Sequence, residues 1–240
     1  MSALGHYLEE AGIASVAIAL IRPQAEHTRP PRALFVPFEL GRPIGPPGDK
    51  AFQRRVILAA LGLLEAKPAA SLIVDFPDDD PREEADPSWH PPVAPAAGGD
   101  RDEAALADAV EAELRALAPA YARSCTARGR STVGLTGLAP AACGEYVAAW
   151  LRGPPPPSPV ADMSAPLALR FAIDDLKAFA LEAAIASGKP SSKQLGDWLW
   201  NETVLGAALQ VLRRHCLAGD DERLKAVAAF FVPALRVPPG

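Results

Sequence analysis

The first 76 residues alternate between apolar runs typical of strands and spaced apolar positions typical of helices. Three runs have the composition of buried strands: Ile13–Ile21, Ala33–Val36 and Ser71–Asp75. Two segments have helical spacing: Leu4–Ala11 and Lys50–Ala66. Asp49 is a natural N-cap for the second of these helices. Because strands and helices alternate, residues 1–76 are predicted to form part of an α/β layer with parallel strands.

From residue 103 onward, apolar positions recur at three- and four-residue steps, which is the helical period. Five helices are predicted: Glu103–Ala127, Pro140–Arg152, Pro166–Ser187, Ser191–Cys216 and Asp220–Val232. Glu202 falls on the apolar face of the fourth helix, so it is expected to pair with an arginine such as Arg170. Residues 103–240 are therefore predicted to form an all-α helical bundle, which makes the whole chain an α+β protein.

Residues 77–102 separate these two parts. They hold eight acidic and two basic side chains, and six prolines lie between residues 77 and 99. Prolines remove backbone donors and like charges repel, so this segment is predicted to be an extended linker. Trp89 either anchors the linker to a neighbouring surface or lies exposed to solvent.

Outside the linker the charges are balanced, with eight basic and seven acidic side chains in residues 1–76 and fourteen of each in residues 103–240. Neither part has the excess of Lys and Arg that a nucleic-acid backbone requires, so no nucleic-acid partner is expected. No apolar run reaches the roughly 18 residues of a membrane span. Three widely spaced cysteines and the lack of a secretory-signal pattern after Met1 favour a cytoplasmic protein. Histidines and cysteines lack metal-ligand spacing, so neither a metal nor a cofactor is predicted.

The motif P-x-x-L-G-x-P occupies residues 37–43. It follows the turn Ala11–Ile13 and an apolar strand run, and it precedes the pair Arg54-Arg55. In this order, the segment resembles the carboxy-terminal part of the substrate-binding subunit of component B (selenoprotein B) of the glycine, sarcosine, betaine and D-proline reductases. The resemblance covers about the first 65 residues.

In that family, a turn that carries selenocysteine or cysteine comes just before the first helix, and its selenolate or thiolate attacks the α-carbon of an N-substituted glycine. The resemblance implies the same order of helix, strand, loop and second helix here, and a pyruvoyl-bearing partner subunit. No cysteine precedes Leu4–Ala11 in this sequence. The chain is therefore expected to be the remainder of a reductase whose reactive residue lies upstream of Met1. The alternative is a short paralogue that never had this residue.

The loop and the strand ends hold the candidate substrate-binding residues: Glu39, Gly41, Arg42 and Arg32. A guanidinium binds the carboxylate of a glycine-type substrate with two parallel hydrogen bonds, and Glu39 would receive the substrate's cation. Ordinary solvated charges are the alternative. Three prolines in residues 41–49 remove backbone donors that a phosphate loop needs, so a nucleotide is not expected. No catalytic residue is predicted, although Cys125 and Cys216 have basic neighbours and are either redox-active thiols or packing residues.

Two functions are open from the sequence. The first is the carboxy-terminal portion of a component-B-like oxidoreductase, which binds a small amino-acid-like or amine substrate and is inactive by itself. Strands that lack their neighbours leave unpaired edges, so a partner subunit or self-association is predicted with it. The second is a non-catalytic helical binding or regulatory protein.

Overall fold

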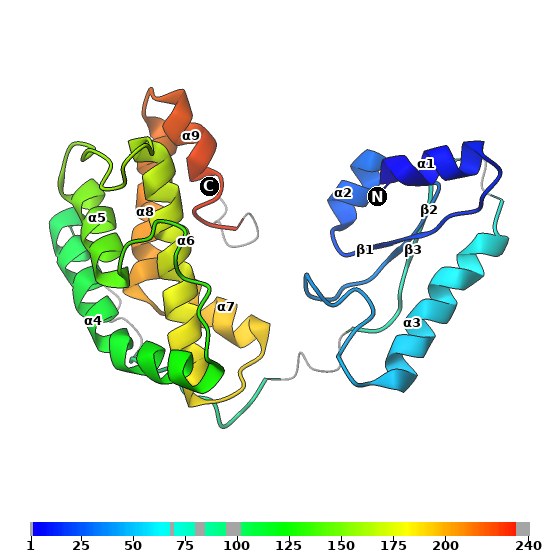
Figure 1. The fold of residues 1–240 in the computed structure, drawn as a ribbon, viewed down its shortest axis with the longest axis horizontal. Helices are drawn as coiled ribbons and strands as arrows, with labels where there is room; N and C mark the ends of the chain where they lie inside the picture. Colours follow the sequence, from blue (N-terminus) through cyan, green and yellow to red (C-terminus); the bar gives the residue numbers. More distant parts are fainter. Residues whose placement is uncertain (1, 68–69, 80–84, 95–101, 234–240) are drawn as a thin grey trace. The chain divides into compact units, whose positions relative to one another are not determined.

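The computed structural model describes residues 2–67, 70–79, 85–94 and 102–233. The chain divides into two units, Met1–Glu84 and Ala85–Gly240. The first unit contains a three-stranded parallel sheet, and the second is built from helices (Figure 1). The predicted α+β class is confirmed.

The sheet of the first unit consists of β1 (Ala17–Ala19), β2 (Arg32–Phe35) and β3 (Leu72–Asp75), side by side in that order. Both pairs of strands are parallel, and Ala33 lies opposite Ala17 on one side and Ile73 on the other. β1 covers only a short part of the predicted strand run. Because β1 and β3 are the outer strands, each has one edge without a strand partner within this described sheet.

Three helices accompany the sheet: α1 (Ser2–Glu10), α2 (Arg22–Thr28) and α3 (Lys50–Gly62), which continues into a 3₁₀ turn, η1 (Leu63–Glu65). As expected, Asp49 caps α3, because its carboxylate accepts a hydrogen bond from the Phe52 N–H at 2.9 Å. The sequence pattern does not predict α2, because Arg22-Pro23 marks the end of an apolar run. Proline is tolerated there because the first N–H groups of a helix have no partner within the helix.

The core of the first unit lies between the sheet and α3. Its buried residues are Leu34, Val36, Phe38, Phe52, Val56, Ala60 and Phe76. Three of the phenylalanine rings have centroids 5.4 to 5.9 Å apart. Phe38 belongs to the loop that joins β2 to α3, so the core fixes this loop beside the carboxyl end of β2.

The second unit contains six α-helices among the described residues. They are α4 (Glu103–Arg128), α5 (Pro140–Arg152), α6 (Ala165–Ala184), α7 (Ser192–Asn201), α8 (Val204–Ala218) and α9 (Glu222–Ala228). A 3₁₀ turn, η2 (Ile185–Ser187), continues α6. The long helix α4 packs against α5, α6 and α8 (Figure 1). α4 and α5 begin and end within one residue of the predicted bounds.

The single helix predicted over Ser191–Cys216 is wrong, because α7 ends and α8 begins near Thr203. The Thr203 hydroxyl accepts a hydrogen bond from the Gly206 N–H at 2.9 Å and so caps a new helix. A Cβ atom at Gly206 would collide with the Leu199 carbonyl, so this tight junction requires glycine. The apolar spacing is similar on both sides of the break, and it therefore hides the break.

Glu202 consequently does not lie inside a helix but at the C-cap of α7. The expected partner Arg170 instead contacts Asp174 at 3.5 Å, and its guanidinium carbon lies 3.7 Å from the centroid of the Phe230 ring. The last predicted helix is also shorter than expected, since α9 ends at Ala228.

Part of the predicted linker packs against the helices of the second unit. Asp86 and Gln194 exchange two hydrogen bonds, from the Asp86 N–H at 2.8 Å and to the Asp86 carbonyl at 2.9 Å. The Trp89 indole donates to the Ala184 carbonyl at 3.1 Å and meets the Trp198 ring edge-on. Of the two alternatives for Trp89, the anchored one is observed. Residues 80–84 and 95–101 of the predicted linker lie outside the described residues.

A buried carboxylate on α6 organises the loop between α4 and α5. The side chain of Asp175 accepts hydrogen bonds from the N–H groups of Gly134, Leu135 and Thr136 at 2.7 to 3.0 Å, and from the Thr136 hydroxyl at 2.7 Å. Burial raises the pKa of Asp175, but these hydrogen bonds outweigh it and hold the pKa below its ordinary value. One ionised side chain therefore accepts from three consecutive backbone N–H groups of this loop.

Two further buried carboxylates act in the same way. Glu182 accepts from the N–H and hydroxyl of Thr132 at 2.7 and 2.8 Å, which lowers its pKa against the effect of burial. Glu113 of α4 accepts from the N–H groups of Val204 and Leu205 at 2.8 Å. These two donors belong to the first turn of α8, where no helical carbonyl is available to them.

Replacing Asp175 by alanine is expected to lower the free energy of unfolding by about 3 to 5 kcal/mol, because several buried donors lose their acceptor together. Asp174, the preceding residue on the same helix, is the matched control. It makes partly exposed ion pairs with Arg170 and Lys177, so Asp174→Ala should cost less than about 1 kcal/mol. Urea unfolding followed by circular dichroism measures both. Equal losses of unfolding free energy in Asp175→Ala and Asp174→Ala would contradict the special role assigned to Asp175.

Acid should destabilise the second unit through Asp175 and Glu182. A carboxyl group whose pKa is lowered by folding stabilises the fold above its unfolded pKa and stops doing so as the pH falls through its folded value. The unfolded values are about 4, so the stabilisation is complete above about pH 5 and decreases below it. Urea unfolding between pH 3 and 6 should show a steeper decline for the original chain than for Asp175→Ala. If the unfolding free energy fell equally with pH in both proteins, Asp175 would not contribute to the acid sensitivity.

Candidate functional site

The loop between β2 and α3 carries three of the four predicted substrate-binding residues. Gly41 and Gly45 have φ angles of 95° and 88°, which L-residues rarely adopt. The Arg42 N–H donates to the Glu39 carbonyl at 3.0 Å, and the Gly45 N–H donates to the Arg42 carbonyl at 2.9 Å. The loop is therefore a pair of consecutive tight turns, and Arg42 lies at their junction.

Gly45 is further required by packing. A Cβ atom at this position would lie 2.5 Å from the ring of Phe52, which belongs to the core beneath the loop. The Gln53 amide also donates to the Pro46 carbonyl at 2.9 Å. The loop is thus held on the first turn of α3 by both apolar contact and hydrogen bonding.

The first turn of this loop brings Glu39 and Arg42 together. Their side chains form an ion pair of 3.6 Å between Arg42 Nη1 and Glu39 Oε2, and each makes further interactions. The side chains are 23% (Glu39) and 40% (Arg42) exposed, so a small molecule can reach both charges. The first turn of the loop therefore places one carboxylate and one guanidinium side by side at its surface.

The fourth predicted residue, Arg32, lies at the opposite end of β2 and is only 6% exposed. Its Nε and Nη2 atoms donate to the Ala66 carbonyl at 2.8 and 2.7 Å, and Nη1 donates to Glu9 Oε1 at 2.5 Å. Hydrogen bonds from the Ser15 N–H and from Arg32 lower the pKa of Glu9. The structure therefore gives Arg32 a role in joining α1, β2 and the end of α3, and does not bring it to the loop.

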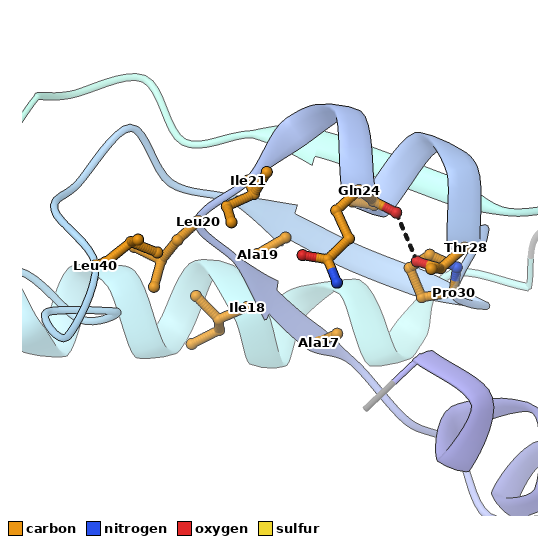
Figure 2. A pocket seen from close by; sticks show the side chains of 10 residues that line it. Ala17, Ile18, Ala19, Leu20, Ile21, Gln24, Thr28, Pro30 and Leu40 are labelled. Carbon is orange, nitrogen blue, oxygen red and sulfur yellow. Dashed lines mark hydrogen bonds between the residues drawn. The ribbon is translucent and has the colours of Figure 1, made fainter. Parts of the chain in front are cut away.

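An open pocket of about 310 Å³ lies beside the loop, along β1 and α2 (Figure 2). It is lined by Ala17, Ile18, Ala19, Leu20, Ile21, Gln24, Ala25, Thr28, Pro30 and Leu40. Figure 2 shows the side-chain amide of Gln24 between the Leu40 end and the Pro30 end of the pocket. The Thr28 hydroxyl donates to the backbone carbonyl of Gln24 at 2.8 Å. Only Gln24 and Thr28 among these residues have polar side chains. The lining can bind a small, largely apolar molecule, and the residues described for it include no Cys, His, Asp, Glu, Lys or Arg side chain.

Arg22 connects the elements at the carboxyl edge of the sheet. Its Nη2 atom lies 2.7 Å from Asp75 Oδ2 at the end of β3, and its guanidinium lies 5.4 Å from the centroid of the Phe35 ring at the end of β2. A longer contact of 3.5 Å joins it to Glu26 in the next turn of α2. Arg22 thus holds α2, and the pocket wall that α2 forms, against the strand ends.

The three cysteines all lie in the second unit. Burial raises the pKa of Cys143, and burial together with the charge of Asp221 raises the pKa of Cys216 to about 11. Cys125 is half-buried, and its sulfur lies 4.0 Å from Glu182 Oε2. A thiolate nucleophile needs a lowered pKa, so Cys143 and Cys216 fit packing better than redox chemistry.

A second pocket, which the sequence pattern does not indicate, lies in the helical unit and has a volume of about 340 Å³. Its floor includes Tyr121, Phe179 and Leu114, and its rim includes Arg115 and Glu145. The Tyr121 and Phe179 rings have centroids 4.7 Å apart, and burial raises the pKa of Tyr121. Tyr121 and Phe179 lie at helical spacing with apolar neighbours, as core residues do. The sequence pattern therefore does not distinguish residues that line a pocket from residues of the core.

Among the described residues, no group of three or more His, Cys, Asp or Glu side chains is arranged to hold a metal ion. No described helix is long and apolar enough to cross a membrane.

Arg32→Ala is expected to lower the free energy of unfolding of the first unit by about 3 kcal/mol, because it leaves a buried carbonyl and Glu9 without their donor. Arg42→Ala is the matched control, since it removes a half-exposed ion pair worth less than about 1 kcal/mol. Urea unfolding of the full chain measures both. A loss of stability in Arg42→Ala as large as in Arg32→Ala would contradict the different roles assigned to the two arginines.

No family model, no curated protein and no solved structure matches this chain.

Proposed function

We propose that the first unit is the carboxy-terminal, substrate-binding part of an oxidoreductase resembling component B of the glycine, sarcosine, betaine and D-proline reductases. The observation that carries this proposal is the Glu39–Arg42 ion pair, held on a tight turn at the carboxyl end of β2 and close to the pocket wall at Leu40. Ligands of parallel α/β sheets bind beyond the carboxyl ends of the strands, which is the position of this turn.

A small amino acid or N-methylated amine suits these groups. The planar guanidinium of Arg42 binds the carboxylate, and Glu39 binds the ammonium group. Leu40 lies between the two charged residues in the sequence and lines the apolar pocket, which takes the methyl groups or ring of the substrate. Gln24 is the polar side chain of the pocket that can add a hydrogen bond.

Binding, rather than bond breaking, is the role assigned to this unit. Displacement at the α-carbon requires a thiolate or selenolate, and residues 1–84 contain no cysteine. The nucleophile must therefore come from a group outside these residues, and the resemblance places it on a turn just before the first helix. Free cysteines and a thiol-based reaction both suit a reducing, cytoplasmic setting.

A second candidate function comes from the helical unit. Its pocket of about 340 Å³ has an aromatic floor and a charged rim, which favours a non-catalytic binding or regulatory role for that unit. The two functions assign the ligand to different arginines, Arg42 in the first unit and Arg115 in the second.

Calorimetric titration of the full chain with glycine, sarcosine, betaine and D-proline tests the proposal. At least one of these ligands should bind, and Arg42→Ala should weaken its binding about 10- to 100-fold, because it removes a charge-assisted pair of hydrogen bonds. Lys50→Ala removes an exposed positive charge that follows the same loop and should leave the affinity unchanged.

Arg115→Ala distinguishes the two candidates. Loss of binding in Arg115→Ala but not in Arg42→Ala would move the ligand to the helical unit. Failure of all four ligands to bind would refute the assignment of an amino-acid-like substrate.

A further inference from the structure

The outer face of α3 is apolar, although the inner face already forms the core. Phe52, Val56 and Ala60 are buried against the sheet. Ile57, Leu58 and Leu61 are 42%, 49% and 50% exposed. These three positions follow helical spacing and form one stripe opposite the buried one. Contiguous exposed apolar residues of this kind mark an interaction surface.

Opposite charges flank this stripe. Arg54 lies one turn before it and Glu65 one turn after it, and both are exposed. Neither residue takes part in an ion pair among the described residues. The neighbouring Arg55, by contrast, is paired with Asp78 and lies near the rings of the core. Arg54 and Glu65 thus place exposed charges of opposite sign at the two ends of the stripe.

The order of these residues is self-complementary. Leu58 and Leu61 are equally distant in sequence from the midpoint of the stripe, between residues 59 and 60. Arg54 and Glu65 are equally distant from the same midpoint, and so are Ile57 and Gly62. When two identical helices pack antiparallel about a two-fold axis, a residue near the contact line faces its counterpart across the midpoint. Leu58 then meets Leu61 of the second copy, and Arg54 meets Glu65.

Gly62 is the one position of this set whose residue type the chain's own fold does not explain. Its φ angle is −60°, an ordinary helical value, so the backbone does not require glycine. A Cβ atom added there would meet nothing within 4 Å, so packing within the described unit does not require glycine either. Glycine weakens a helix relative to alanine. In the antiparallel pair, Gly62 lies at one flank of the stripe and leaves room there for the second helix.

We propose that a second copy of this chain binds along the outer face of α3, antiparallel and related by a two-fold axis at the midpoint of the stripe. A second copy is the favoured occupant because the charges and the leucines each match their own counterpart across the midpoint. The surface is small compared with that of a stable protein–protein interface, so the dimer should dissociate in roughly the micromolar range. This dimer does not depend on the substrate assigned to the loop.

Sedimentation velocity of the full chain over a range of concentrations tests the proposal. The original chain should show a reversible monomer–dimer equilibrium. Arg54→Glu alone and Glu65→Arg alone should each weaken it about tenfold, because each places like charges opposite one another at both ends of the stripe. The double variant Arg54→Glu/Glu65→Arg restores both attractions and should return the dissociation constant to within about threefold of the original.

Controls separate the surface from general effects of charge and from unfolding. Arg223→Glu, at an exposed position of α9, should leave the dissociation constant unchanged. Circular dichroism melting should give the same transition for every variant, because the substituted side chains are exposed. Three results would overturn the proposal: a monomer at all concentrations, a dimer that the single reversals do not affect, or a double variant that stays as weak as the single ones. The last two would point to another surface or to another partner for α3.

Discussion

The helical unit depends on carboxylates buried where backbone N–H groups have no other acceptor. Asp175 and Glu182 lie seven residues apart on α6, so both project from the same side of that helix. The loop after α4 has no regular structure to satisfy its own donors, and these two side chains satisfy several of them. Glu113 does the same for the start of α8. α6 therefore provides both apolar core and the acceptors that fix a loop.

The first unit uses a buried cation in the same manner. Arg32 donates to the Ala66 carbonyl and to Glu9, and so joins three separate chain segments at the amino end of β2. The carboxyl end of the sheet contains the more accessible charges, Glu39 and Arg42. Arg32, at the amino end of β2, is buried and stabilises the fold, whereas Glu39 and Arg42, beyond its carboxyl end, remain accessible to a ligand. This division is the physical basis for assigning the substrate to the loop.

Regular elements with strong local signals could be predicted from the sequence, whereas long-range polar contacts could not. Asp49 predicts the start of α3, and apolar spacing predicts α5 with its observed bounds. The break at Thr203 was hidden because apolar spacing is similar on both sides of it. The proximity of Glu39, Gly41 and Arg42 could be predicted because these residues are close together in the sequence. The place of Arg32 at the other end of β2 could not be predicted, because its partners, Glu9 and Ala66, are distant in sequence and their contact depends on the tertiary fold.

Cys216 is a buried thiol on the inner face of α8. Burial and the charge of Asp221 raise the pKa of Cys216 to about 11, so this thiol is almost entirely protonated at neutral pH. Thiol–disulfide exchange proceeds through the ionised form, so a disulfide at this buried thiol forms slowly. Cys216 therefore contributes apolar packing to α8 and is a poor nucleophile.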